Sequence, residues 1–340
     1  MKILFAIQAT GNGHLSRARE IIPHLLNYGE LDLLISGTQA DVTLPYLIKF
    51  KKHGAGFTFG KKGGVDIIDT VKNFKPFNFF SDIFNFPVQD YDLVINDFEP
   101  ITAWACKLKN QKCIALSHQS SFLSNKVPRP EKQDIFAEWI LKNYAPSTSR
   151  YSFHFKQFDK HIYTPVIRSE IRNLETSNKG HITVYLPAHS DELLIKNLSK
   201  INDVQWDIYS KHSKIAYSDR NIHITPINNE LFNKSLASGD GLLTAGGFES
   251  PAEAIHLRKK VMMIPMSNQY EQQCNALAAK DLGVTVVKEI DDNFSVKLKS
   301  WLDYGFPPNI FYPDITGKII EDLMLNHSIE NFQIDISRFA

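Results

Sequence analysis

The feature that most constrains the fold of this chain is an alternation of short apolar runs with longer amphipathic runs, which occurs twice along the sequence. In the first series, apolar runs at 2–7, 31–36, 93–96 and 113–117 predict strands, and the runs at 14–27 and 101–108 predict helices. In the second series, strands are predicted at 181–186, 205–209, 221–224, 241–243, 261–264 and 284–287. Such alternation is typical of a parallel sheet covered by helices, so we expect two α/β units.

The length of the chain also favours two domains. A single hydrophobic core stops growing at about 250 to 300 residues, and this chain has 340. We expect a first domain at 1–165 and a second at 175–315, joined by a polar segment near Pro165 that lacks periodicity. The segment 316–340 is predicted to be helical to about Met324 and irregular beyond, and it is a candidate for packing back on the first domain.

Composition limits the partners and the compartment. The formal net charge of +1 gives no overall field that would attract nucleic acid or an anionic membrane. No segment approaches the roughly 20 apolar residues that span a bilayer. The three cysteines form no CxxC pair, which suits buried thiols in a reducing compartment. These observations predict a cytoplasmic protein with no nucleic-acid partner and at most peripheral contact with the inner face of a membrane.

A glycine loop, Gly11-Asn12-Gly13-His14, lies between the first predicted strand and the first predicted helix. This is the carboxyl edge of the sheet, where open α/β folds bind their ligands. As a dinucleotide fingerprint the loop is incomplete, because Ser16 replaces the third glycine and no acidic residue ends the second strand. The loop instead brings an imidazole to the edge, where it is able to accept a proton from a hydroxyl. The alternative is that His14 only caps or packs the helix.

Asp97 follows the strand predicted at 93–96, so the fold should bring it to the same edge as His14. There it would orient the imidazole and stabilise its protonated form. The alternative is that Asp97 caps the next helix, which has Pro100 in its first turn. Asp90 and Asp92 imitate a metal-binding DxD motif, but they precede the strand and belong at the opposite edge. We therefore predict no metal site.

A second glycine loop, Gly246-Gly247, joins the strand at 241–243 to a helix that carries Glu253. A strand, a glycine turn and a helix N-terminus form a site for an anion such as a diphosphate. The simpler alternatives are a tight turn at the glycines and a capping interaction between Ser250 and Glu253. A segment at 265–276, with clustered amides and a carboxylate, follows the next strand and suits recognition of sugar hydroxyls.

With these motifs the sequence resembles the GT-B glycosyltransferases, specifically the inverting group that includes the peptidoglycan N-acetylglucosaminyltransferase and the nucleotide-diphosphate glucosyl- and glucuronosyltransferases. The resemblance rests on 244–248 with Glu253, on Pro265 with 271–272 and 275–276, and on 11–14. It implies two Rossmann-like domains that face each other across a cleft. This sequence lacks the family's proline shortly after His14, and no tryptophan marks a stacked uracil.

The resemblance also implies a role for each matching residue. His14 would be the general base with Asp97 as its partner, and Gly11, Asn12 and Gly13 would form the acceptor and phosphate loop. The donor would be bound by Gly246, Gly247 and Phe248 at the diphosphate, Glu253 at the ribose, Ile227 at the nucleobase, and Glu271, Gln272 and Gln273 at the sugar.

These expectations describe an inverting, metal-independent glycosyltransferase without a cofactor. The expected donor is a UDP-sugar, and the expected acceptor is lipid-linked or a saccharide, as in cell-envelope glycoconjugates. Two alternatives are a sugar-nucleotide epimerase of the same architecture and a non-catalytic protein that binds nucleotide sugars.

A segment rich in lysine and phenylalanine precedes the third predicted strand and is a candidate acceptor or membrane-contact region. Aromatic clusters more often belong to the core, which is the alternative. The residues concerned are Lys49, Lys51, Lys52, Lys61, Lys62, Phe74, Phe77, Phe79, Phe80, Phe84 and Phe86.

Overall fold

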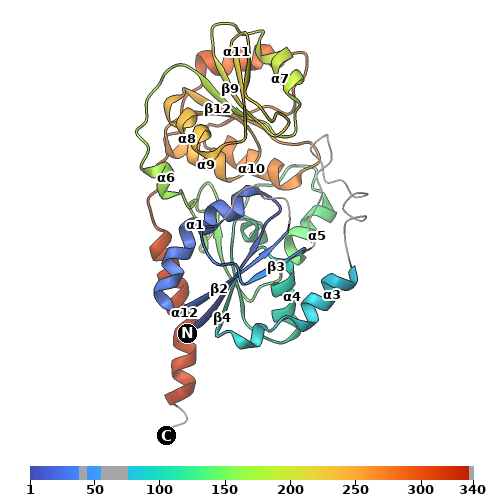
Figure 1. Ribbon diagram of the computed structural model, residues 1–340, viewed down its shortest axis with the longest axis vertical. Helices are drawn as coiled ribbons and strands as arrows, with labels where there is room; N and C mark the ends of the chain where they lie inside the picture. The colour runs from blue at the N-terminus through green and yellow to red at the C-terminus, as the bar shows by residue number, and fades with distance from the viewer. Residues whose placement is uncertain (38–43, 55–75, 337–340) are drawn as a thin grey trace.

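The computed structural model describes residues 1–37, 44–54 and 76–336 and contains two seven-stranded sheets, one in each half of the chain (Figure 1). The first sheet and its helices are called the N-terminal domain, and the second the C-terminal domain. In the N-terminal domain all strand pairings are parallel. The strand order is β3 (Phe50–Lys52), β2 (Glu30–Ser36), β1 (Lys2–Gln8), β4 (Leu93–Asp97), β5 (Cys113–Ser117), β6 (Ser149–Phe153) and β7 (Ile162–Tyr163).

The C-terminal sheet is parallel apart from one antiparallel pair, β10 with β11, at its edge. Its strand order is β10 (Tyr217–Asp219), β11 (Ile222–Pro226), β9 (Trp206–Ser210), β8 (Ile182–Tyr185), β12 (Gly241–Ala245), β13 (Lys260–Ile264) and β14 (Thr285–Val286). The central strands β4, β5 and β12 are buried throughout, because helices cover both faces of each sheet.

Helices connect the strands of each domain. Those of the N-terminal domain are α1 (Asn12–Leu25), α3 (Pro76–Asn85), α4 (Pro100–Leu108) and α5 (Ile135–Asn143), with 3₁₀ turns η1 (Leu26–Tyr28), η2 (Val88–Asp90) and η3 (Gln119–Leu123). Those of the C-terminal domain are α7 (Asp191–Leu198), α8 (Asn229–Ser238), α9 (Glu249–His256), α10 (Tyr270–Lys280) and α11 (Phe294–Tyr304). In Figure 1, α9 and α10 lie on the side of the C-terminal domain that faces α1.

The chain crosses between the domains twice. The short helix α6 (Ser169–Arg172) lies in the first crossing, and α12 (Thr316–Ile336) follows the second and runs beside α1 (Figure 1). Arg172 links the two crossings, because its Nη1 donates to the carbonyl oxygen of Tyr312 at 2.7 Å. The last helix therefore belongs spatially with the N-terminal domain.

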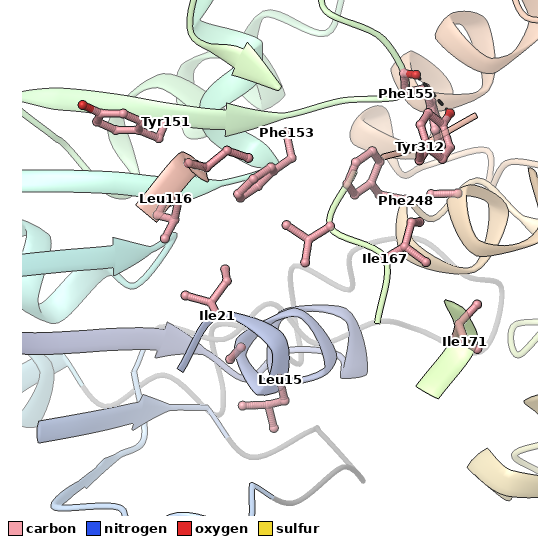
Figure 2. Close-up of a cluster of buried hydrophobic side chains, with 14 of the residues drawn as sticks. Leu15, Ile21, Leu116, Tyr151, Phe153, Phe155, Ile167, Ile171, Phe248 and Tyr312 are labelled. Atoms are coloured by element: carbon pink, nitrogen blue, oxygen red, sulfur yellow. Dashed lines mark hydrogen bonds between the residues drawn. The ribbon is translucent and has the colours of Figure 1, made fainter. Parts of the chain in front are cut away.

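One buried apolar cluster continues from the N-terminal sheet into the C-terminal domain. Figure 2 shows Phe153 beside the strands of the N-terminal sheet, and Phe155 farther along the cluster next to Tyr312 and Phe248. The rings of Phe155 and Phe248 have centroids 5.0 Å apart, and the Tyr312 hydroxyl donates to the Phe155 carbonyl oxygen at 3.0 Å. Apolar burial therefore holds the domains together at this point.

The structure departs from the sequence-based predictions at several elements. The strands β3, β6, β7 and β10 were not predicted, and α12 continues to Ile336 where an irregular segment was expected. The three cysteines are buried and free, as predicted. None of the helices in the described ranges is long and apolar enough to cross a membrane.

The phenylalanine segment divides into buried and exposed residues. Phe86 is buried, whereas the side chains of Phe77, Phe80 and Phe84 on α3 are exposed. Lys61, Lys62 and Phe74 lie outside the described residues.

Candidate functional site

His14 and Asp97 meet at the carboxyl edge of the N-terminal sheet. Asp97 is the last residue of β4 and stands opposite Ile7 of β1, so the loop after β1 begins next to it. Helix α1 starts at Asn12 after the extended Gly11, which places His14 in the first turn. The two side chains are 2.9 Å apart, from Nδ1 of His14 to Oδ1 of Asp97. Because an ionised carboxylate only accepts hydrogen bonds, Nδ1 carries the proton in this contact, and in that tautomer Nε2 is left to accept one.

The two capping alternatives for this site are not observed. Glu99, not Asp97, caps α4, with its carboxylate accepting from the backbone N–H groups of Ile101 at 2.9 Å and Thr102 at 2.7 Å. Phe98 lies between the two acids with a φ of 56°, a conformation that is uncommon outside glycine. This turn sends Glu99 to the helix and leaves Asp97 to His14. Helix α1 has Gly11 as its N-cap and no side-chain cap from His14.

Arg17 is the central cation of the site, and the sequence did not predict it. Its Nη2 donates to both oxygens of Asp97 at 2.8 Å, and its Nη1 donates to Glu249 of α9. Burial alone would raise the pKa of the Asp97 carboxyl, but the charges of Arg17 and His14 and their hydrogen bonds outweigh it and lower that pKa. Arg17 therefore keeps Asp97 ionised and connects it to the C-terminal domain.

The two glycines of the second loop, Gly246 and Gly247, have different surroundings. The N–H of Gly246 donates to Oε1 of Gln272 at 3.0 Å, and the same oxygen accepts from the N–H of Met266 at 3.1 Å. A Cβ on Gly246 would lie 2.6 Å from Gln272 and 2.9 Å from Pro265, whereas a Cβ on Gly247 would meet nothing within 4 Å. Gly246 is therefore required for packing, and Gly247 borders open space. The Gln272 oxygen, expected to face a ligand, instead joins the loops after β12 and β13.

Helix α9 begins directly after this loop, at Glu249, with Phe248 as its N-cap. The N–H groups of the first turn of a helix have no partner within the helix and attract an anion. Phe248 itself stacks on His118 of the N-terminal domain, with centroids 3.9 Å apart and planes 4° apart. The Phe248 ring is therefore part of the contact between the domains.

Glu253 has a structural partner that the sequence did not reveal. Arg168, in the first crossing between the domains, donates from Nε to Oε1 at 2.5 Å and from Nη2 to Oε2 at 2.8 Å. Both residues are buried, so substitution of Glu253 would remove the buried counter-ion of Arg168 and leave it with Glu170, which is more exposed. The alternative capping contact between Ser250 and Glu253 is not among the hydrogen bonds of the described chain.

The remaining predicted donor residues lie on the same side of the C-terminal domain. Glu271, in the first turn of α10, accepts from Nε2 of Gln119 at 3.1 Å across the domain boundary, and burial raises the pKa of its carboxyl. Gln273 donates to the Ser267 carbonyl oxygen at 2.6 Å. Ile227 follows β11, and its N–H donates to the carbonyl oxygen of Ser210 at 3.1 Å. These residues surround the carboxyl edge of the C-terminal sheet.

The two glycine loops face each other. A Cβ on Gly13 would lie 3.1 Å from Cγ of Glu249, so the loop of Gly11, Asn12 and Gly13 packs against the start of α9. Five residues of this arrangement were missed from the sequence: Arg17, His118, Gln119, Arg168 and Glu249. His118 and Gln119 had a usable signal, because they directly follow β5 at the carboxyl edge.

The acidic pair Asp90 and Asp92, which imitates a DxD motif, lies where the sequence predicted it. The backbone N–H of Lys2, at the amino end of β1, donates to Oδ2 of Asp92 at 2.7 Å, so this acidic pair lies at the opposite edge of the sheet. Across residues 1–37, 44–54 and 76–336, no group of three or more His, Cys, Asp or Glu side chains has a metal-binding arrangement.

Comparisons with known proteins agree on the family and the fold. The profile described as glycosyl transferase family 1 matches residues 1–303.

Solved structures show the same fold. MurG of Acinetobacter baumannii is similar in structure, with a TM-score of 0.54 and 13% identity over 89% of this chain and 91% of that chain. Arabidopsis thaliana UGT89C1, solved with UDP, has a TM-score of 0.56 and 13% identity over 96% of this chain and 100% of that chain. Phytolacca americana UGT2, solved with UDP-2fluoro-glucose and pterostilbene, has a TM-score of 0.57 and 14% identity over 96% of this chain and 93% of that chain. A search of curated proteins finds no match.

The two glycines give a paired prediction. Gly246→Ala should lower the free energy of unfolding by about 1 to 3 kcal/mol, because its Cβ overlaps the backbone and side chain of Gln272. Gly247→Ala should change it by less than about 0.5 kcal/mol, because its Cβ enters open space. Urea denaturation measures both values. Equal destabilisation by the two substitutions would contradict the claim that only Gly246 is required for packing.

Proposed function

Because the chain belongs to glycosyl transferase family 1, we propose that it catalyses an inverting transfer of a sugar from a UDP-sugar to an acceptor hydroxyl, with His14 as the general base. The observation that carries this proposal is the 2.9 Å contact of His14 with Asp97, beside the two facing glycine loops. Transfer from nucleotide sugars is the activity of the family. Inversion, the base and the uracil nucleotide are our proposals.

The proposed reaction is a single displacement at the anomeric carbon. Nε2 of His14 takes the proton of the acceptor hydroxyl while the oxygen forms a bond to the anomeric carbon. The bond from that carbon to the β-phosphate oxygen breaks, and the nucleoside diphosphate leaves with the electron pair. One displacement inverts the configuration. Asp97 holds the ring through Nδ1 and stabilises its protonated form.

The donor is proposed to bind along the carboxyl edge of the C-terminal sheet. The diphosphate would lie at Gly247 and the N-terminus of α9, where free N–H groups and the helix dipole favour negative charge. Ile227 would meet the nucleobase, Glu253 the ribose, and Glu271 with Gln273 the sugar. Support for uracil comes from the structural neighbours solved with UDP and UDP-2fluoro-glucose.

The acceptor is proposed to be lipid-linked and to be met at the inner face of a membrane, from the cytoplasm. The exposed phenylalanines of α3 form one stripe, because positions 77, 80 and 84 recur at helical spacing. Lys52 forms an ion pair with Asp82 of the same helix at 2.6 Å, so β3 packs near α3. Exposed apolar side chains on a helix with cations in the same region suit an anionic lipid surface.

Substitution of the proposed base should separate catalysis from binding. We expect His14→Ala to lower the rate of transfer by about 100-fold to 10,000-fold and to leave donor affinity nearly unchanged, because the donor residues lie on the other domain. His24→Ala, near the end of the same helix, is the matched control and should transfer at the normal rate. Steady-state kinetics and calorimetric binding of UDP-sugars measure the two effects. Normal turnover by His14→Ala would exclude this base, and donor turnover without acceptor would indicate an epimerase.

Catalysis is proposed to need no divalent cation, because the N-terminus of α9 supplies positive charge at the proposed diphosphate position. Activity should therefore be unchanged after dialysis against a chelator. Complete inhibition that added Mg²⁺ or Mn²⁺ reverses would contradict this proposal.

The proposed membrane contact is tested by removing the apolar stripe. The triple substitution Phe77→Ser, Phe80→Ser and Phe84→Ser should reduce binding to vesicles that contain anionic lipid by more than about tenfold, because it removes three exposed aromatic rings. Thermal stability should change little, since 89%, 53% and 62% of these residues' surfaces are already in water. Phe306→Ser in the C-terminal domain, 69% exposed, is the control. Equal vesicle binding by all three proteins would exclude this surface.

A further inference from the structure

Glu249 occupies the place where the donor diphosphate is proposed to bind. It is the first residue of α9, and its side chain passes beside Gly13 of the facing loop. Its carboxylate accepts from Nη1 of Arg17, and 16% of the side chain is exposed. A helix N-terminus and a buried guanidinium are the two features of this site that would bind a phosphate. The guanidinium is already engaged by a carboxylate of the protein itself, which belongs to the first residue of that helix.

The charges around this position do not favour a second anion. Two guanidinium groups, those of Arg17 and Arg168, lie among five acidic side chains. The acidic side chains are Asp97, Glu170, Glu249, Glu253 and Glu271. A nucleotide sugar brings two further negative charges, and like charges in a partly buried site repel strongly. Donor binding is therefore easier if one carboxylate leaves or becomes neutral.

Glu249 is the carboxylate best placed to do so. Asp97 is fully buried and holds both His14 and Arg17, and Glu253 is fixed by two hydrogen bonds from Arg168. Among the residues that the structure describes, the Glu249 carboxylate has one hydrogen-bond partner, and it lies at the boundary between the domains. In addition, Nε of Arg17 is buried and has no partner within the described part of the chain, so Arg17 retains a donor for a new ligand.

We propose that Glu249 is an internal counter-anion that occupies the diphosphate position on Arg17 and α9, and that a nucleotide sugar binds only when this carboxylate is displaced or neutralised. The inference rests on the proposed function, because it concerns the donor of that reaction. Glu249 thereby sets the affinity for the donor.

The protonation of Glu249 gives this exchange a pH dependence. Burial raises the pKa of the Glu249 carboxyl to about 7, against the opposing charge of Arg17. The carboxyl is mostly neutral at pH 6 and mostly ionised at pH 8, so donor affinity should fall by about tenfold between these values. The charged and titratable groups that face it are His14, Arg17, Asp97, Arg168 and Glu253.

The test compares Glu249→Gln with the unsubstituted protein by calorimetric titration of UDP-glucose and UDP-N-acetylglucosamine at pH 6, 7 and 8. A nucleotide sugar is used because its diphosphate is esterified at both ends and does not titrate in this range, unlike a terminal phosphate. We expect Glu249→Gln to bind about tenfold more tightly at pH 8 and to lack the tenfold fall in affinity between pH 6 and pH 8 that Glu249 contributes. Groups other than Glu249 are common to both proteins, so the difference isolates this carboxylate.

Three further variants make the test specific. Glu249→Asp keeps the charge and should retain weak, pH-dependent binding. Glu249→Ser, a second neutral variant, should bind as tightly as Glu249→Gln and guards against misfolding of either one. Asp32→Asn removes a carboxylate that is paired with Lys49 on the far side of the N-terminal sheet, and should leave the affinity unchanged.

The outcomes separate this inference from the proposed function. If Glu249→Gln and Glu249→Ser bind no more tightly than the unsubstituted protein at pH 8, the counter-anion is excluded while the proposed function stands. If no protein in the series binds a UDP-sugar, and ADP- and GDP-sugars also fail, the proposed donor fails and the inference fails with it.

Discussion

The site depends on the guanidinium of Arg17, which holds one carboxylate from each domain. Asp97 belongs to the N-terminal sheet and Glu249 to the C-terminal domain, and Arg17 itself is 2% exposed. A buried charge is costly without a counter-ion, so the position of this side chain is fixed by both partners. Separation of the domains would return Glu249 to water and leave Asp97 as the partner of Arg17. The geometry of the proposed base is therefore coupled to domain closure.

Helix α9 carries a second ion pair to the rest of the chain, one turn after Glu249. Glu249 and Glu253 are four residues apart, so they lie on one face of the helix, and each binds an arginine from outside the C-terminal sheet. Arg17 comes from α1, and Arg168 from the first crossing between the domains. The helix that presents its N-terminus to the proposed diphosphate is thus held at two points by the rest of the chain. Movement of one domain relative to the other would therefore change the position of this N-terminus relative to α1.

The sequence predicted what depends on local pattern and missed what depends on contacts between distant residues. The strand expected at 113–117 is β5, Cys113–Ser117, because a short buried apolar run between polar residues has a clear pattern. The strands β3, β7 and β10 have two or three residues, too few to show periodicity. His14 and Asp97 could be placed together because both follow parallel strands. Arg17 and Glu249 are 232 positions apart, and an arginine of an amphipathic helix gives no sign that it is buried.

The boundary between the domains also contains a contact that opposes closure. Burial lowers the pKa of His118 to about 3, so its ring is neutral and has one N–H to donate. Both atoms that face the ring nitrogens accept hydrogen bonds: the Phe153 carbonyl oxygen at 2.8 Å and Oδ1 of Asn275 at 2.8 Å. Rotation of the Asn275 amide would satisfy His118, but it would turn the amide oxygen toward the Gly246 carbonyl oxygen, which now accepts from Nδ2 at 3.1 Å. In either orientation one pair of acceptors faces each other. This contact therefore offsets part of the stabilisation that the Arg17 and Arg168 ion pairs give to the boundary between the domains.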